Sequence, residues 1–258
     1  MGSALMSPAK RSLQLPEVNI SDDGELRYLH LATPWVQGAM RVDAPYDIAL
    51  EYVQRMMAWL LFVEPDSVAK RRAMQLGLGA GAITKFCWKK LRMRTTAVEL
   101  NPQVVHVCRS WFKLPPDGPR MAVVQGDAGT EIRQVGHLAT IDALAVDMYD
   151  DDAAAPVLDS VDFYRDARAV LTDEGCMTVN LFGRTNHYEQ SVARIAEAFG
   201  QEAVWAFKPT REGNTIVLAQ RTPSRPRRAL LLERAAGIEE RWGLPARKWL
   251  RSFKPVAD

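Results

Sequence analysis

Hydrophobic and polar positions repeat with two different periods along this chain, and the change of period divides it. From residue 17 to residue 42, short extended segments flank the turn signal Asp22-Asp23-Gly24, which predicts a small N-terminal β segment. Apolar residues at helical spacing then predict a helix that starts at Asp43, carries Pro45 in its first turn and ends before Pro65. From residue 66 to residue 221, strand-like and helix-like segments alternate, which is typical of a parallel sheet with helices on both faces.

The order of the alternating segments predicts a doubly wound, mostly parallel, seven-stranded sheet. The predicted strands cover residues 72–79, 95–100, 121–128, 141–149, 176–182, 203–209 and 215–221. The predicted helices between them cover residues 83–91, 101–112, 129–136, 161–171 and 187–199. The last two strands form a closing hairpin, which makes one edge antiparallel. This arrangement is that of the class I S-adenosylmethionine-dependent methyltransferase-like Rossmann fold, although a fold does not by itself fix a function.

Composition changes this picture little. A chain of 258 residues with 47% hydrophobic and 25% charged residues is ordinary for a globular protein, and the net charge of +2 gives no argument for a nucleic-acid partner. The three cysteines are far apart and the four histidines lack ligand spacing, so we expect a reducing cytoplasm and no metal site. The longest apolar run, residues 56–63, is too short to cross a membrane.

A glycine-rich loop follows the first strand of the alternating region. Gly77, Gly79 and Gly81 stand between a strand and a helix, where glycine permits a tight turn and close approach to a ligand. Glu99 ends the next strand, where a carboxylate can accept hydrogen bonds from both hydroxyls of a ribose. The spacing lacks the third glycine of the dinucleotide form Gly-x-Gly-x-x-Gly. We therefore predict a nucleoside cofactor of the S-adenosylmethionine type; the alternative is a tight turn beside a surface acid.

Two further acids end later strands of the predicted sheet. Asp127, followed by Ala128, suits an adenine edge, because its carboxylate can accept from the exocyclic amine; Asp147 closes an apolar strand. Ligands of open α/β sheets bind at the carboxyl ends of the strands, so we expect Glu99 and these two acids to share one crevice. The acidic run at 147–152 is either a solvated loop or a crevice mouth that attracts a polycation.

The chain from about Trp35 to Gln220 resembles the spermidine synthase (polyamine aminopropyltransferase) family. The matching segments, in the family's order, are WVQGA, LGLGAGAI, AVELNPQVVHVCR, VVQGDA, AVDMYDDDAAAP and DFYRDARAVLTDEGCMTVN. The resemblance implies that the protein moves an aminopropyl group from decarboxylated S-adenosylmethionine to a small cationic amine. It implies these roles: Glu99 on ribose, Asp127 on adenine, Asp147 as the amine-binding catalytic acid, Asp150 as its partner, and Gln37 near the cofactor.

The chain departs from the family where the substrates are recognised. The family's loop reads Gly-Gly-Gly-Asp-Gly-Gly, and its acid recognises the free amine of the decarboxylated donor, whereas Ala80 stands at that position here. The family's Tyr-His-Glu becomes Tyr52-Val53-Gln54, Thr210 stands where a late loop has tyrosine, and the N-terminal strand region is short. The loop acid would repel the carboxylate of S-adenosylmethionine, so Ala80 leaves methyl transfer as a second hypothesis. A third is a non-catalytic nucleoside-binding protein.

These features divide the chain into four expected regions. Residues 1–16 are expected to be disordered, residues 17–65 to form the N-terminal β segment and helix, and residues 66–221 to form the nucleoside-binding, Rossmann-like catalytic domain. Residues 222–258 form a basic, helical C-terminal tail whose basic residues alternate with acidic ones, which disfavours a role with nucleic acid or membrane. We expect this tail to pack on the body or on a second subunit, and we expect a cytoplasmic homodimer.

Overall fold

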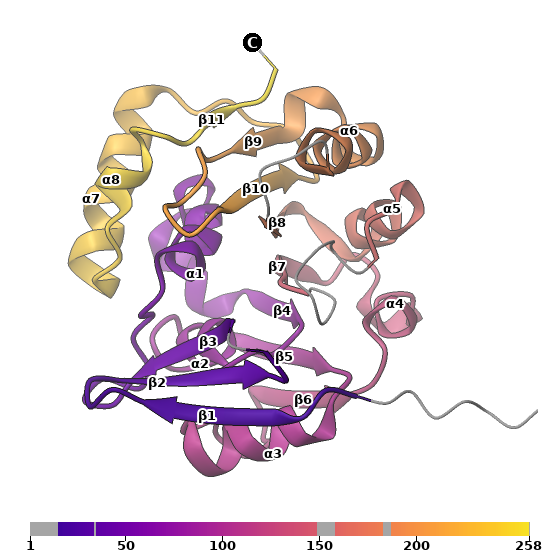
Figure 1. Cartoon of the computed structure of the whole chain (residues 1–258). Coiled ribbons are helices and arrows are strands. Elements are labelled where there is room, and N and C mark those ends of the chain that lie inside the picture. The colour runs from indigo at the N-terminus through magenta and orange to yellow at the C-terminus, as the bar shows by residue number, and fades with distance from the viewer. Residues whose placement is uncertain (1–14, 34, 149–157, 183–186, 258) are drawn as a thin grey trace, which may run out of the picture.

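The computed structural model describes residues 15–33, 35–148, 158–182 and 187–257. Within them, the main sheet has the strand order β11-β9-β10-β8-β7-β4-β5-β6 (Figure 1). Its strands are β4 (Arg72–Leu76), β5 (Arg94–Glu99), β6 (Met121–Gln125), β7 (Ile141–Val146), β8 (Leu171–Phe182), β9 (Val204–Ala206), β10 (Asn214–Gln220) and β11 (Lys254–Pro255). The first five are parallel, and β10 pairs antiparallel with both β8 and β9. The predicted mostly parallel sheet with its closing hairpin is therefore confirmed, and β11 adds a short edge strand.

Helices cover both faces of this sheet, as the alternating pattern predicts. They are α2 (Ala82–Lys89), α3 (Pro102–Trp111), α4 (Ala128–Glu131), α5 (Val161–Val170) and α6 (His187–Phe199). Apolar residues of α5 and α6 form one buried cluster with the sheet, and those of α2 belong to a second cluster on the other face. Helix α3 begins as the sequence predicts: Pro102 occupies its first turn, and the Asn101 side chain accepts a hydrogen bond from the backbone N–H of Gln103.

The N-terminal segment folds into a separate antiparallel sheet of β1 (Val18–Asp22), β2 (Leu26–Leu31) and β3 (Val36–Arg41). Figure 1 shows this sheet beside the β5–β6 end of the main sheet. Strand β3 lies directly against the glycine-rich loop, because a Cβ atom added to Gly38 would be 2.6 Å from the backbone nitrogen of Ala80. A glycine at position 38 therefore lets the small sheet cover this loop.

The helix predicted from Asp43 starts later than expected. Helix α1 covers only Glu51–Arg55 and continues as the 3₁₀ helix η1 (Met56–Phe62), and residues 43–50 form turns and bends. Asp43 does not cap a helix; its carboxylate pairs with the guanidinium of Arg41 at 2.9 Å. The predicted helix at 129–136 is likewise divided, into α4 and the 3₁₀ helix η3 (Val135–His137).

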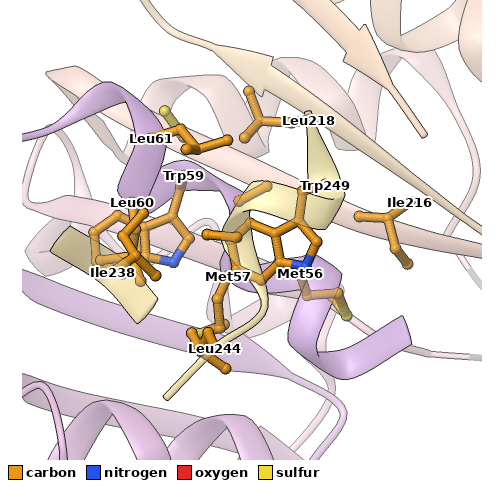
Figure 2. Packing of buried hydrophobic residues seen from close by; sticks show 14 of the residues in the cluster. Met56, Met57, Trp59, Leu60, Leu61, Ile216, Leu218, Ile238, Leu244 and Trp249 are labelled. Carbon is orange, nitrogen blue, oxygen red and sulfur yellow. The ribbon is translucent and has the colours of Figure 1, made fainter. Parts of the chain in front are cut away.

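The apolar run of η1 is the centre of the largest buried cluster. Figure 2 shows Met57 and Trp59 of this segment packed among Ile238, Leu244 and Trp249 of the C-terminal tail. A further 3₁₀ helix, η2 (Pro65–Lys70), leads into β4. No helix in the described part of the chain is long and apolar enough to cross a membrane.

The C-terminal tail packs on the body of its own chain. It consists of α7 (Arg228–Trp242), α8 (Ala246–Trp249) and β11, which pairs antiparallel with β9. The ring of Phe253 stacks on that of Phe207, with 4.5 Å between the ring centroids. The tail therefore completes both the core around η1 and the outer edge of the main sheet.

A lysine is buried beneath the glycine-rich loop. Lys85, on α2, is only 1% exposed. Its Nζ donates a hydrogen bond to the backbone oxygen of Phe112 at 2.6 Å. The salt bridges found among the described residues do not include Lys85. Burial lowers the pKa of Lys85 to about 8, because the charged ammonium is less well solvated inside the protein.

This buried amine predicts a stability difference that depends on pH. Below about pH 8 the amine of Lys85 is charged in the folded and unfolded states, and its burial costs up to about 3 kcal/mol. Between pH 8 and the ordinary pKa of 10.5, the unfolded chain binds a proton that the folded chain does not, so the cost declines. We expect the free energy of unfolding of Lys85→Met, minus that of wild type, to fall by about 1–3 kcal/mol between pH 7 and pH 10.

Urea unfolding of both proteins across this range measures that difference. The subtraction cancels the contributions of the buried thiols of Cys87 and Cys176, whose raised pKa values are not affected by Lys85. A difference that stays constant with pH would show that the amine of Lys85 is not desolvated.

Candidate active site

A cavity of about 950 Å³ lies at the carboxyl ends of the parallel strands, where β3 faces the main sheet. Glu99, Asp127 and Asp147 all line it, so the three strand-end acids share one crevice as the sequence predicts. The other candidates on its wall are Gln37, Gly77, Gly79 and Ala128. Gly81 does not line the cavity; it lies behind the loop at the start of α2. Asp150, together with Asp151 and Asp152, lies outside the described residues.

The glycine loop has a backbone that only glycine adopts without strain. Gly77, Gly79 and Gly81 have φ angles of +83°, +51° and +69°. A Cβ atom on Gly77 would lie 2.2 Å from the backbone oxygen of Asp147, and one on Gly79 would lie 3.0 Å from that of Gln37. The loop therefore passes between β7 and β3 at a separation that no side chain permits.

Gln75 holds this loop, and the sequence analysis did not identify it. Its Nε2 donates hydrogen bonds to the backbone oxygens of Gly77 (2.7 Å) and Leu78 (3.2 Å). Its Oε1 accepts from the backbone N–H and from the hydroxyl of Thr84, at 3.0 and 2.5 Å. Since Gln75 is only 2% exposed, this amide rigidly links the loop to α2. A polar residue inside the apolar strand Ala73–Leu76 is the signal that could have revealed it.

Glu99 reaches the cavity from the end of β5. Its Oε2 accepts from the backbone N–H of Leu78, and its Oε1 accepts from that of Asn101, both at 2.8 Å. Burial raises the pKa of Glu99, and these backbone hydrogen bonds oppose the rise. The carboxylate is therefore held in one orientation at the cavity wall. Its role as an acceptor for the two hydroxyls of a ribose stays a prediction.

Asp127 has a structural partner in addition to its place in the cavity wall. Its Oδ1 accepts from the backbone N–H and the hydroxyl of Thr130, both at 2.8 Å, which caps α4. Ala128 and the exposed side chain of Leu100 line the cavity beside it. An acid next to small and apolar walls suits an adenine ring with an exocyclic amine, and this role of Asp127 stays a prediction.

Asp147 belongs to a hydrogen-bonded chain of four side chains. Its Oδ1 accepts from Asn180 Nδ2 at 2.9 Å, and its Oδ2 accepts from the Tyr52 hydroxyl at 3.4 Å. Asn180 is oriented in turn, because its Oδ1 accepts from Asn214 Nδ2 at 3.1 Å. The two asparagines were not identified from the sequence, because they come from β8 and β10, which meet only in the folded sheet.

Burial sets the protonation behaviour of this group. Burial raises the pKa of Asp147 to about 6, although the hydrogen bonds from Asn180 and Tyr52 act to lower it. Burial and the neighbouring carboxylate also raise the pKa of Tyr52 well above its ordinary value, so the phenol stays neutral. Near neutral pH, Asp147 is therefore an ionised carboxylate that can take up a proton at little cost, which are the properties of a general base.

The positions that depart from the family lie mostly off the cavity. Ala80 is 2% exposed and packs under Gly38, Val53 is in the core, and neither lines the cavity. Gln54 donates to the backbone oxygen of Ile48 at 2.9 Å, and the hydroxyl of Thr210 accepts from the backbone N–H of Asn214 at 3.2 Å. These four side chains have structural partners here.

The described part of the cavity wall has one sign of charge. Its ionisable side chains, apart from Tyr52, are all carboxylates, and it includes no lysine, arginine or histidine. They are Glu51, Glu99, Asp127, Asp147 and Glu212. Carboxylates around a low-dielectric cavity attract cationic ligands. In the described residues, no group of histidine, cysteine, aspartate and glutamate side chains could hold a metal ion.

The central, mostly parallel sheet with its flanking helices is the Rossmann-like fold that spermidine synthases and methyltransferases share. A probable spermidine synthase from Corynebacterium glutamicum superimposes with a TM-score of 0.74 at 18% identity, covering 92% of this chain and 87% of that chain. Human methyltransferase-like protein 13, in complex with SAH, gives a TM-score of 0.67 at 22% identity, covering 76% of this chain and 93% of that chain.

Sequence comparison is more specific than this shared fold. Polyamine aminopropyltransferases from Neisseria meningitidis and Chromobacterium violaceum are 31% and 30% identical to this chain, over 251 and 256 residues. Both alignments cover 96% of this chain, and they cover 92% and 95% of those relatives. No family model matches the chain. The chain belongs to the polyamine aminopropyltransferase family, which confirms the resemblance.

The geometry of Glu99 predicts how its removal affects nucleoside binding. In Glu99→Gln, one oxygen acceptor becomes an amide donor, so a ribose hydroxyl or a backbone N–H loses its partner. We expect the affinity for methylthioadenosine to weaken by about 1.5–3 kcal/mol in calorimetry, while circular dichroism shows a folded protein. Glu240→Gln, on the exposed side of α7, is the control and should bind as wild type does. Unchanged affinity in Glu99→Gln would assign Glu99 to holding the loop alone.

Proposed function

We propose that this chain moves an aminopropyl group from decarboxylated S-adenosylmethionine to a small cationic amine. One observation carries the proposal: Asp147, a desolvated carboxylate held by Tyr52 and Asn180, lies in the same cavity as Glu99 and the glycine loop. An acid suited to activating an amine thus shares a cavity with a site suited to an adenosyl group.

In this proposal, the nucleoside half of the cavity fixes the donor. Glu99 accepts hydrogen bonds from the ribose hydroxyls, and Asp127 accepts from the adenine amine beside Ala128. The donor supplies an electrophilic carbon next to its sulfonium sulfur. Gly77 and Gly79 lack side chains, so the donor can approach the loop backbone closely.

Asp147 acts on the acceptor. Its carboxylate attracts the protonated amine and takes up one of its protons, and the neutral amine nitrogen then attacks the donor carbon. The new C–N bond forms as the C–S bond breaks, methylthioadenosine leaves as a neutral thioether, and the product nitrogen carries the positive charge that the sulfonium had. Much of the acceleration comes from holding the two reactants in line. On the family pattern, Asp150, which is outside the described residues, acts as the partner of Asp147. Gln37 lines the cavity wall and acts near the donor.

The charge of the cavity supports the decarboxylated donor. S-adenosylmethionine carries a carboxylate, and the described cavity wall contains carboxylates and no lysine or arginine to pair with it. The decarboxylated donor and an amine acceptor are both cationic and match this wall. In this proposal, the acidic wall takes part in discriminating between the two donors. In the family that is the role of the loop acid, and this chain has Ala80 at its position.

Ala80 is the observation that favours a second function. Without the loop acid, one source of repulsion against S-adenosylmethionine is missing, so methyl transfer is the alternative, and a non-catalytic nucleoside-binding protein is the third. A cytoplasmic location and a homodimer also stay predictions.

A thermal-shift comparison of donors distinguishes these functions. A ligand at about 100 times its dissociation constant stabilises the folded chain by about 2.7 kcal/mol, which raises the melting temperature by roughly 5–10 °C for a domain of this size. We expect methylthioadenosine and decarboxylated S-adenosylmethionine to give this shift and S-adenosylmethionine to give a smaller one. A larger shift with S-adenosylmethionine would favour methyl transfer, and the lack of a shift with all three would exclude a nucleoside site.

Substitution of Asp147 tests the proposed base. Asp147→Asn keeps the size of the side chain but loses its charge and basicity, so the rate with a diamine acceptor should fall at least about a hundred-fold. In wild type, kcat/KM for the acceptor should fall below about pH 6, where the carboxylate becomes protonated, and this decline should be absent in the variant. Affinity for methylthioadenosine should change little. A variant that retains most of the wild-type rate would rule out Asp147 as the base.

A further inference from the structure

Basic residues gather at the amino ends of β4, β5 and β6, which is the end of the sheet opposite to the cavity. Between residues 67 and 98 the sequence has eight lysines and arginines and no aspartate or glutamate. The net charge of +2 therefore conceals an uneven distribution. Such a local excess of positive charge indicates a surface for an anionic partner even where the totals nearly balance.

The sheet places three arginines side by side at this end. Arg72 and Arg94 are register partners in the parallel pair β4–β5. Arg120 directly precedes β6, and its backbone oxygen accepts a hydrogen bond from the N–H of Thr95. Neighbouring strands are about 4.8 Å apart, so the backbones of these arginines span roughly 10 Å. All three arginines are exposed.

The end of α2 and the turn that follows it bring two further cations to the same end. Lys89 is the last residue of α2, Arg92 lies in the turn before β5, and both are exposed. The Nζ of Lys89 and the guanidinium carbon of Arg120 lie 5.8 and 5.7 Å from the centroid of the Trp88 ring. Nη1 of Arg120 also donates to the backbone oxygen of Trp88 at 3.2 Å. These contacts hold two cationic groups around one half-buried ring.

Three acids near these cations have other partners. Arg71 pairs with Asp142 at 3.4 Å and with Glu174 at 2.7 Å. Lys90 pairs with Asp47 at 2.5 Å. Five exposed cations, which we call the basic edge, take part in none of the salt bridges found in the described part of the chain: Arg72, Lys89, Arg92, Arg94 and Arg120. Their charge is therefore available to a partner.

We propose that the basic edge binds the phosphate backbone of a single-stranded nucleic acid. The planar fork of N–H donors on arginine matches phosphate oxygens, and each neutralised phosphate releases its counterions. Guanidinium planes and aromatic rings are also the surfaces on which unpaired bases stack. A single strand therefore suits this mixture of arginines and Trp88 better than a duplex, whose bases stack on one another.

The basic edge and the cavity lie at opposite ends of the same strands. Strands β4, β5 and β6 have five or six residues each, which corresponds to about 17–20 Å. A nucleic acid bound at the basic edge therefore leaves the cavity open. The proposal does not depend on the proposed function, because it uses none of the residues that line the cavity.

Fluorescence anisotropy with a labelled oligouridylate of about twelve nucleotides tests the proposal. The test variant is the triple variant Arg72→Gln/Arg92→Gln/Arg94→Gln. At low salt we expect it to bind at least about tenfold more weakly than wild type. The slope of log Kd against log salt concentration should fall by about 2, because each lost phosphate contact removes about 0.7 from the slope for a single strand.

A matched control removes the same charge elsewhere. Arg227→Gln/Arg228→Gln/Arg251→Gln changes three exposed arginines of the C-terminal tail, and it should retain most of the wild-type affinity and slope. Equal weakening in both triple variants would show that the probe responds only to net charge, and would overturn the proposal. The single variant Arg92→Gln should lower the slope by about 0.7, so the test remains decisive if the triple variant fails to fold.

Competition against the labelled strand identifies the anion. We expect the unlabelled oligouridylate to displace the probe more effectively than an RNA duplex of the same length, inorganic polyphosphate or polyglutamate. Stronger displacement by polyglutamate would assign the basic edge to an acidic protein. Stronger displacement by the duplex or by polyphosphate would exclude single-strand recognition. Each of these results would overturn the proposal, as would the lack of salt-dependent binding by wild type.

Discussion

The active cavity depends on the close approach of the glycine loop to the strands on either side of it. At Gly77 the loop lies so near the backbone of Asp147 that even a methyl group would collide, and at Gly38 strand β3 lies equally close to Ala80. Gln75 holds the loop in this position with hydrogen bonds to two of its carbonyl groups and to the start of α2. This packing brings the end of β7, the loop and β3 around one cavity.

Burial at the strand ends accounts for the electrostatics of the cavity. It removes water from Asp147 and Glu99, which raises the pKa of both carboxyl groups. Backbone N–H groups compensate at Glu99, and side chains from two elements, Tyr52 of α1 and Asn180 of β8, compensate at Asp147. A buried carboxylate with partial compensation lowers stability, and such groups are commonly retained where chemistry needs them. Asp147 fits this description.

The charge of the cavity wall bears on the missing loop acid. Ala80 is buried beside β3 and does not line the cavity. In the proposed function, discrimination between donors comes from the wall itself, which in its described part has carboxylates and no lysine or arginine. Specificity at this site is a property of the whole surface, because long-range charge effects add over all the groups that face a low-dielectric cavity.

The sequence by itself determined the elements, their order and the strand-end acids. Alternating patterns, Pro102 after Asn101, and glycines before α2 are local signals, and ligands of such sheets gather at the strand ends, so Glu99, Asp127 and Asp147 could be placed together in advance. The start of α1 could not be predicted in this way, because Asp43 pairs with Arg41 instead of capping a helix. Only the tertiary structure revealed Asn180 and Asn214 behind Asp147, Gln75 under the loop, and Trp35 beside Phe182. Those contacts join residues distant in sequence, and their energies depend on burial and geometry that no local pattern encodes.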